Sequence, residues 1–191
     1  MRIIAGQYRG RSLLAAKGEQ TRPITSRVKT ALFSILGGAV ADAVVVDLFS
    51  GTGSIGLEAI SRGASRCYFA ERNRLAIDRL RRNIEAMRVG DRCWIWRGDV
   101  LRHLAHWLEE VPGPVDLAFV DPPYRLSAQW RWQEACERLF DPLGGRLSAA
   151  GQVVLRCQRN IELPDALGTL CVRSRRDYGK MSLVFLSLPE T

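Results

Sequence analysis

The sequence contains little lysine, little histidine and no long hydrophobic run. Of its 28 basic residues only Lys17, Lys29 and Lys180 are lysines, and the two histidines are His103 and His106. With so few imidazoles we expect no histidine-based acid–base catalysis. His103 and His106 lack a cysteine or carboxylate cluster beside them, so we predict no metal site. No apolar run approaches the roughly 18 residues that cross a membrane, and the first residues lack the apolar stretch of a secretory signal.

The cysteines show no spacing that is typical of disulfides or metal sites. The five cysteines are an odd number and form no C-x-x-C pair, which is typical of free thiols in a reducing compartment. Apolar residues make up 47% and charged residues 25% of the 191 residues, as in ordinary soluble globular proteins. We therefore predict a cytoplasmic protein with one domain and at most a short extension.

Positive charge is concentrated at the start of the chain. The formal net charge is +8. Residues 1–30 hold seven basic residues and one acidic residue, a net charge of +6, and the remaining residues carry only +2. An arginine-rich proteome would explain the excess of arginine over lysine but not this clustering. The distribution predicts a polyanionic partner such as a nucleic acid.

The basic segment divides into a hairpin and a helix. Two apolar runs, 3–5 and 12–14, flank a turn rich in glycine and arginine, which predicts a short β-hairpin. Thr25 or Ser26 can cap a helix that ends at Gly37-Gly38. We therefore expect a basic N-terminal extension over residues 1–38 and a second region, with its own pattern of strands and helices, over residues 39–191.

Strands and helices alternate through the rest of the chain. Strands are expected at 43–47, 66–70, 93–97, 115–120, 152–156, 170–175 and 181–188. Helices are expected between the first five of them, the last at 129–140. This order predicts an α/β fold with a seven-stranded, mostly parallel, Rossmann-like sheet that ends in an antiparallel hairpin. In such sheets ligands bind beyond the carboxyl ends of the strands.

The first strand ends in an acidic residue followed by a glycine loop. Asp47 precedes the pattern Gly51-x-Gly53-x-x-Gly56, which taken alone also matches a dinucleotide fingerprint. A carboxylate at this place would repel a pyrophosphate and suits a cationic group better. The arrangement resembles motif I of S-adenosylmethionine-dependent methyltransferases, and that resemblance assigns Asp47, Ser50, Gly51 and Gly53 to the cofactor.

The second and third strands also end in carboxylates. Glu71 can accept hydrogen bonds from ribose hydroxyls, which both nicotinamide cofactors and S-adenosylmethionine carry. Asp99 can accept from an adenine amino group, as it would in the methyltransferase family. It can equally cap the helix that follows, and the two roles can coexist.

The fourth strand ends in the most specific pattern of the chain, Asp121-Pro122-Pro123-Tyr124. It resembles motif IV of methyltransferases that act on planar nitrogen atoms. The lone pair of an exocyclic amine is delocalised into its base, so the amine is a poor nucleophile. The Asp121 carboxylate and the Pro122 carbonyl can each accept one amino hydrogen and direct the lone pair outward. Tyr124 can stack on the base. We predict that these four residues form the catalytic loop.

With these residues in place, nearly the whole chain resembles the RsmD family, bacterial methyltransferases that modify guanine N2 in small-subunit (16S) ribosomal RNA. The N-terminal segments 2–11 and 21–29 are similar to the family's opening and to its Arg-Pro-Thr-x-x-Arg-Val signature, with Ile24 where threonine is common. The resemblance implies an S-adenosylmethionine cofactor and a monomer that acts on a partly or fully assembled small subunit. It also implies that Arg22, Thr25 and Arg27 lie near the cofactor and the target base. By the same resemblance, residues 1–38 contact RNA and act as a lid, and residues 39–191 form the catalytic domain.

The basic hairpin of the family implies RNA contacts by Arg9 and Arg11, so Arg9, Arg11, Arg22 and Arg27 are the predicted substrate-binding residues and Thr25 joins the predicted cofactor site. Three alternatives remain open at this point. They are an amino-methyltransferase acting on DNA adenine or protein glutamine, an NAD-dependent oxidoreductase, and a non-catalytic RNA-binding protein with a methyltransferase fold.

Overall fold

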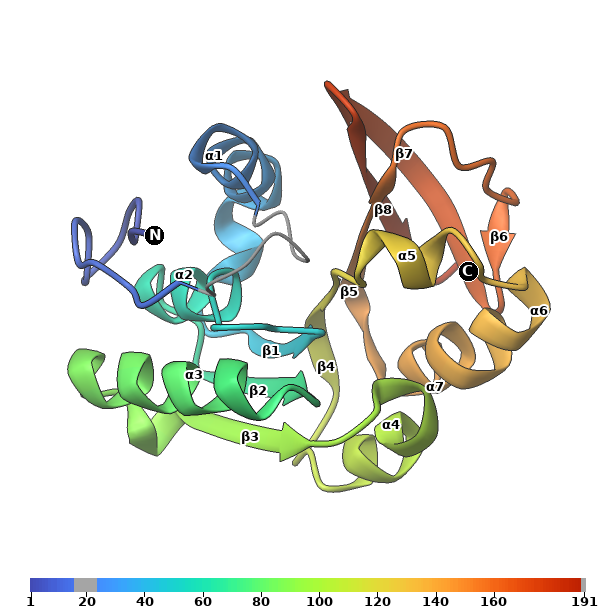
Figure 1. Cartoon of the computed structure of the whole chain (residues 1–191). Coiled ribbons are helices and arrows are strands. Elements are labelled where there is room, and N and C mark those ends of the chain that lie inside the picture. The colour runs from blue at the N-terminus through green and yellow to red at the C-terminus, as the bar shows by residue number, and fades with distance from the viewer. Residues whose placement is uncertain (16–23, 190–191) are drawn as a thin grey trace.

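The structure of the protein, a computed structural model, describes residues 1–15 and 24–189. Arg22, one of the predicted substrate contacts, lies outside these residues. The central element is a single mixed β-sheet with the strand order β3-β2-β1-β4-β5-β8-β7-β6 (Figure 1). Its strands are β1 (Val44–Leu48), β2 (Arg66–Glu71), β3 (Cys93–Arg97), β4 (Val115–Val120), β5 (Leu147–Gln158), β6 (Ala166–Leu167), β7 (Leu170–Tyr178) and β8 (Met181–Ser187).

The direction of the strands follows the prediction. Strands β3, β2, β1, β4 and β5 run parallel to one another. Strand β8 pairs with β5 in the antiparallel direction, and β7 and β6 continue with antiparallel pairs. The α/β class with a mostly parallel sheet and an antiparallel C-terminal hairpin is confirmed. An eighth strand, β6, joins the predicted seven at the edge of the sheet. Two residues are too few to leave an alternating pattern in a sequence.

Helices cover both faces of this sheet. They are α1 (Ser26–Leu36), α2 (Gly56–Ser61), α3 (Arg74–Met87), α4 (Val100–Glu109), α5 (Tyr124–Ser127), α6 (Trp132–Ala135) and α7 (Asp141–Gly144), with the 3₁₀ turns η1 (Gly37–Val40) and η2 (Gly90–Arg92) and the π-helical turn η3 (Cys136–Phe140). The helix predicted at 129–140 begins only at Trp132, passes through the π-helical turn η3 and continues without a gap into α7.

Alternation along each strand divides the core into two. Val45 packs with side chains of α1, α2 and α3, whereas Val46 and Leu48 pack with those of α4, η3 and α7. The β-branched run of β1 is therefore buried on both faces, which a parallel sheet between two helical layers requires. Ligand access is left to the ends of the strands.

The N-terminal segment folds back on itself but does not form the predicted pair of strands. One antiparallel bridge joins Arg2 to Ser12. The N–H groups of Ile4 and Ala5 donate instead to the Glu58 carboxylate of α2, at 2.8 and 3.0 Å. The two arms are paired where the Ile3 N–H donates to the Arg11 carbonyl and the Leu13 N–H donates to the Met1 carbonyl. The next donor in that antiparallel pattern is the Ala5 N–H, which Glu58 accepts, so the ladder stops there.

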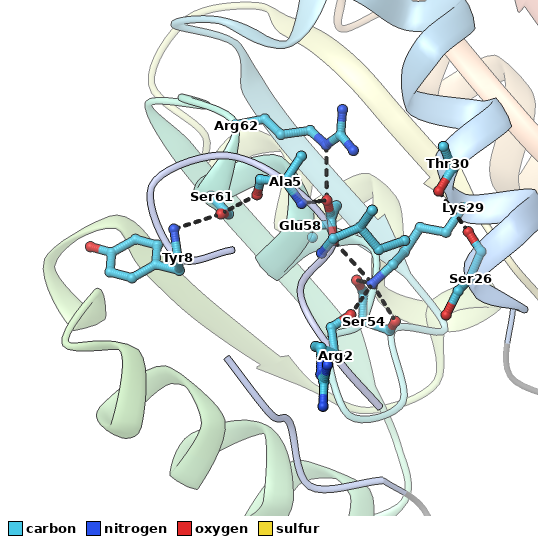
Figure 2. A network of polar contacts seen from close by, with 12 residues as sticks. Arg2, Ala5, Tyr8, Ser26, Lys29, Thr30, Ser54, Glu58, Ser61 and Arg62 are labelled. Carbon is cyan, nitrogen blue, oxygen red and sulfur yellow. Dashed lines mark hydrogen bonds and ion pairs between the residues drawn. The ribbon is translucent and has the colours of Figure 1, made fainter. Parts of the chain in front are cut away.

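Figure 2 shows how Glu58 ties this segment to the body of the protein. Glu58 is fully buried and pairs with Lys29 of α1 at 3.1 Å and with Arg62 at 2.9 Å. The Lys29 ammonium also donates to the carbonyls of Arg2 and Ser54. Burial lowers the pKa of Lys29, and the Glu58 carboxylate opposes that shift. The N-terminal segment and the glycine loop are thus held by the same buried ammonium.

Candidate functional site at the carboxyl edge of the sheet

Three acidic side chains from neighbouring strands meet at one edge of the sheet. Asp47 lies near the end of β1, Glu71 ends β2, and Asp121 directly follows β4. Since β1 pairs in parallel with both β2 and β4, their carboxyl ends lie side by side. The expected convergence of strand-end carboxylates is present. Such an edge favours a ligand that carries positive charge.

The Asp47 side chain is hydrogen-bonded to the end of the glycine loop. Its side chain is 1% exposed, and its Oδ2 atom accepts the Gly56 N–H at 2.8 Å. Burial raises the pKa of Asp47 to about 8, and Asp121 and Glu71 add to the shift. The Oδ1 atom has no hydrogen-bond partner among the described residues. A buried oxygen without a partner is costly, so this atom is suited to a ligand group.

The three glycines of the loop have different surroundings. A Cβ atom on Gly53 would lie 2.4 Å from Leu80, and one on Gly56 would lie 2.4 Å from Phe69. These two glycines let α2 and its loop pack closely on the core. Gly51, with φ of +56°, has open space where a side chain would stand. Among the three, Gly51 is the one with room beside its Cα atom for a ligand to approach.

Glu71 fixes the other side of this loop. One of its oxygens accepts the Gly51 N–H at 2.8 Å, and the other accepts the N–H groups of Arg72 and Asn73, each at 2.8 Å. The N–H of Ser50 donates to the Ala70 carbonyl at 3.0 Å. Backbone donors thus set the position of the carboxylate that was predicted to receive a ribose.

Two further predicted cofactor contacts act as helix caps. Asp99 accepts the Leu101 N–H at 3.0 Å at the start of α4, and its other oxygen lies 3.2 Å from Arg72. The capping role expected for Asp99 is confirmed. Thr25 accepts the Val28 N–H at 3.4 Å at the start of α1. Arg27 is exposed on the first turn of α1.

Asp121 is held by an arginine from the end of β5, which belongs to none of the sequence motifs. The Nε atom of Arg156 lies 2.5 Å from the Asp121 Oδ1 atom, and both side chains are largely buried. The Arg156 guanidinium also lies over the Tyr124 ring, 5.6 Å from its centroid, which is a cation–π arrangement. Burial raises the pKa of Asp121, and the Arg156 charge opposes the shift.

The two prolines shape the loop between Asp121 and Tyr124. Pro122 is buried. The Pro123 carbonyl accepts the N–H groups of Leu126 and Ser127 and starts α5. Because α5 uses the Pro123 carbonyl, the Pro122 carbonyl is the better candidate for accepting from a substrate. Asp121, Tyr124 and Arg156 are brought together as one cluster.

A sequence signal for Arg156 existed. The residue interrupts the apolar run Val153-Val154-Leu155 of β5, and Leu155 is in register with Val120. A charge at this position must therefore stand beside residue 121. A second unrecognised residue is Lys29, a lysine on the apolar side of α1 whose side chain is 1% exposed.

The predicted RNA contacts Arg9 and Arg11 lie elsewhere. Arg11 donates to the Ala86 carbonyl near the C-terminal end of α3, and the adjoining Tyr8 N–H donates to Ser61 at the end of α2. These helix ends lie toward the amino edge of the sheet. Figure 1 shows the N-terminal segment and α5 on opposite sides of the molecule.

In residues 1–15 and 24–189 no three His, Cys, Asp or Glu side chains gather in a group that could hold a metal ion. No helix within the same ranges is long and apolar enough to cross a membrane.

Comparison with known proteins agrees with the geometry. A family model described as "Conserved hypothetical protein 95" matches residues 1–187. The protein named "Putative rRNA methyltransferase YlbH" of Bacillus subtilis is 33% identical over 179 residues, which cover 94% of each chain. The chain belongs to the RsmD family of ribosomal RNA methyltransferases. "Ribosomal RNA small subunit methyltransferase D" of Escherichia coli is 35% identical over 125 residues, covering 65% of this chain and 61% of its own.

A solved structure has the same fold over the whole chain. The structure titled "Putative methyltransferase yhhF from Escherichia coli" superposes with a TM-score of 0.81 at 27% identity, over 100% of this chain and 99% of that one. The predictions of an RsmD-family methyltransferase and of an S-adenosylmethionine cofactor are confirmed at the level of the family. The NAD-dependent oxidoreductase is thereby set aside.

Proposed function

We propose that this RsmD-family enzyme transfers a methyl group from S-adenosylmethionine to the N2 amine of a guanine in small-subunit ribosomal RNA. The observation that supports the proposal most directly is the catalytic loop Asp121–Tyr124 beside a carboxylate-lined cofactor edge. Asp121 is fixed by Arg156 at 2.5 Å and followed by two prolines and an aromatic ring. This set of groups suits a planar amine.

The residues of β1 and β2 fit the cofactor. The unpartnered Oδ1 atom of Asp47 and the open space beside Gly51 suit a cationic ligand that lies close to the chain. We assign Ser50, Gly51 and Gly53 to the loop that holds it, Glu71 to its ribose, Asp99 to its adenine and Thr25 to its cover. When bound, S-adenosylmethionine supplies an electrophilic methyl group on a sulfonium.

Asp121 and Pro122 prepare the amine. The Asp121 carboxylate accepts one amino hydrogen and the Pro122 carbonyl the other, so the nitrogen lone pair points away from both acceptors. The negative charge of Asp121 also stabilises the positive charge that develops on the nitrogen. Tyr124 stacks on the base and holds its plane, and in-line positioning supplies much of the rate.

Arg156 adjusts the chemistry of Asp121. Burial raises the pKa of this carboxyl group, and the arginine charge opposes the shift. An ionised Asp121 is the stronger acceptor for the amine and can also take up the proton released after transfer. We assign Arg156 as a positioning residue, because it acts on the substrate only through Asp121 and Tyr124.

RNA binding also involves the N-terminal extension, in addition to the catalytic loop. The target guanine must leave its stack to reach Asp121, and loops of RNA make this inexpensive. We propose that residues 1–38 form a basic RNA-binding extension of the catalytic domain 39–191, with Arg9, Arg11, Arg22 and Arg27 on the RNA. The substrate would be a partly or fully assembled small subunit, and the enzyme a cytoplasmic monomer.

The test is methyl transfer with identification of the product. Small subunits are purified from a strain that lacks its own enzyme, incubated with the protein and tritiated S-adenosylmethionine, and digested to nucleosides. Mass spectrometry should find N2-methylguanosine. Incorporation into adenine, or no incorporation into the RNA, would contradict the proposal. Parallel assays on DNA and on protein glutamine separate the other amino-methyltransferases.

A further inference from the structure

A cleft opens beside the catalytic loop on its β5 side, away from β1 and β2. Its volume is about 670 Å³, within the range of small-ligand sites. It is lined by Tyr124, Gln158, Arg159, Asn160, Gly179 and Lys180. Apart from Tyr124, none of these residues has a role in the site described above.

The strand order explains why this cleft matters. In the sheet, β4 stands between β1, which carries the glycine loop, and β5, which leads to the cleft. If the methyl donor approaches Asp121 from the β1 side, the rest of the substrate must extend toward β5. Figure 1 shows α5 next to β5 and the β7–β8 hairpin, and the cleft lies among these elements.

The end of β5 connects the cleft to the catalytic loop. Side chains two residues apart on a strand share a face, so Gln158 lies on the same face of the sheet as Arg156. Arg156 contacts Asp121 and lies over Tyr124, and Tyr124 lines the cleft. A base that stacks on Tyr124 would therefore have Gln158 near its edge.

The turn between β7 and β8 forms the far wall. Tyr178 pairs with Met181 around the two-residue turn Gly179-Lys180, and Gly179 has a φ of +60°, as such tight turns require. The Arg159 N–H donates to the Lys180 carbonyl at 3.0 Å. This bond fixes the turn against the end of β5, so the wall is set by backbone geometry.

We propose that this cleft binds the ribonucleotide that carries the target guanine, with Gln158 on the base edge and Lys180 on a phosphate. The inference rests on the function proposed above and extends it to substrate recognition.

The chemistry of guanine selects an acceptor at Gln158. With the N2 amine placed on Asp121, the next group along the base edge is N1–H, a donor. In adenine, with its amine at the same place, the neighbouring N1 is an acceptor. The amide oxygen of Gln158 can accept from guanine N1–H, and flipped bases are commonly identified along this edge.

The two cations that line the cleft, Arg159 and Lys180, differ in whether a carboxylate offsets their charge. Arg159 lies 3.2 Å from the Asp177 carboxylate, which offsets its charge. Lys180 is exposed on the turn. A compact ammonium on the outer wall suits a phosphate oxygen. We therefore assign the phosphate to Lys180, with Arg159 mainly supporting the turn.

Lys180→Ala tests the phosphate contact. Its dissociation constant for small subunits from the deficient strain should rise about 3- to 10-fold at 0.1 M salt, and the slope of log K against log salt should fall by about 0.7–0.9. Arg102→Ala, which removes an exposed cation on α4, is the control and should leave both quantities near the wild-type values.

Gln158→Leu and Gln158→Glu test the base contact. The leucine variant should lose about 10- to 100-fold in kcat/KM because guanine N1–H is left without an acceptor. The glutamate variant keeps an acceptor and should stay within about 5-fold. Calorimetric affinity for S-adenosylmethionine, unchanged in both, shows that the fold is intact.

The outcomes separate the two proposals. Normal transfer by the wild type together with unaltered Gln158→Leu and Lys180→Ala variants would overturn the cleft assignment alone. A selective loss in Gln158→Leu with retention in Gln158→Glu supports it, whereas equal losses in both variants contradict the acceptor role. No transfer to guanine by the wild type would overturn both proposals.

Discussion

The two halves of the carboxyl edge hold their acidic side chains by different means. On the β1–β2 half, Asp47 and Glu71 accept backbone N–H groups, all at 2.8 Å. On the β4–β5 half, Asp121 is bound by the side chain of Arg156 at 2.5 Å. The first half is built by the main chain, and the second by one ion pair.

The difference corresponds to different tasks. Backbone donors fix the shape of a loop, and shape is what a bound cofactor needs. A buried ion pair also controls protonation, because burial raises the pKa of Asp121 while Arg156 opposes the shift. Variants should therefore separate the halves: changes at β1–β2 should weaken cofactor binding, and changes at β4–β5 should slow transfer.

The largest effect should follow from Asp121→Asn. The amide retains the shape of the side chain but loses the charge that accepts from the amine and takes up the proton. We expect kcat to fall about 10²- to 10⁴-fold, with the dissociation constant for S-adenosylmethionine within about 3-fold of wild type. Single-turnover methyl transfer and calorimetry measure the two quantities.

The matched control is Asp78→Asn, an exposed carboxylate of α3 whose partner Arg81 lies 3.9 Å away. It should transfer methyl groups at the wild-type rate. Full activity of the Asp121→Asn variant would contradict the catalytic role of this carboxylate. Loss of S-adenosylmethionine binding in the variant would contradict the division of tasks between the two halves of the edge.

Arg156→Leu should give the second-largest effect. Without the guanidinium, Asp121 and Tyr124 lose their common support, and we expect kcat to fall about 10²-fold. The pKa of Asp121 should rise further, since burial is no longer opposed. Activity that needs the ionised carboxylate is lost as pH falls through that pKa, so the acidic limb of the kcat profile should move to higher pH.

Arg156→Lys provides the comparison, because it restores a positive charge without the planar contact over Tyr124. It should return the acidic limb toward the wild-type pH while recovering only part of kcat. If Arg156→Leu lowered kcat with no movement of the limb, the arginine would support the loop without influencing protonation.

The contrast also explains which parts of the site could be predicted from the sequence. The ends of β1, β2 and β4 followed from short apolar runs that each end in a carboxylate, and a parallel sheet must bring such ends together. The backbone donors to Asp47 and Glu71 lie at most 20 residues away along the chain. Local spacing was therefore sufficient for the β1–β2 half.

The β4–β5 half could not be predicted in the same way, because its ion pair joins residues that are far apart in the sequence. Arg156 lies 35 residues from Asp121, and only the register of β4 with β5 brings them together. The N-terminal hairpin was overestimated for a similar reason. Its pattern was local, but Glu58, more than 50 residues away, accepts the Ala5 N–H, which a longer ladder would need.

Glu71→Gln should show a smaller effect on the opposite half. The amide presents an NH₂ group where the carboxylate accepts from Gly51 or from Arg72 and Asn73, so one side of the loop loses its acceptor. We expect the dissociation constant for S-adenosylmethionine to rise about 10-fold. Because Asp121 and Arg156 are untouched, kcat at saturating cofactor should stay within about 3-fold. Equal losses in both quantities would contradict the division of tasks.

The smallest effect is expected from the double variant Arg9→Ala, Arg11→Ala, which acts on neither half. The turn that carries these arginines contacts the ends of α2 and α3 on the side of the molecule away from α5. It can reach RNA but not the reacting base. We expect about 5-fold weaker binding to small subunits and a shallower salt dependence, with kcat unchanged once the RNA is saturating.

The control is the double variant Arg131→Ala, Arg138→Ala, which removes two exposed cations over the other face of the sheet. It should alter neither the affinity for small subunits nor the salt dependence of binding. A fall in kcat on replacing Arg9 and Arg11 would mean that the extension also arranges the catalytic edge, for which the shared contacts of Lys29 with Arg2 and Ser54 provide a direct route.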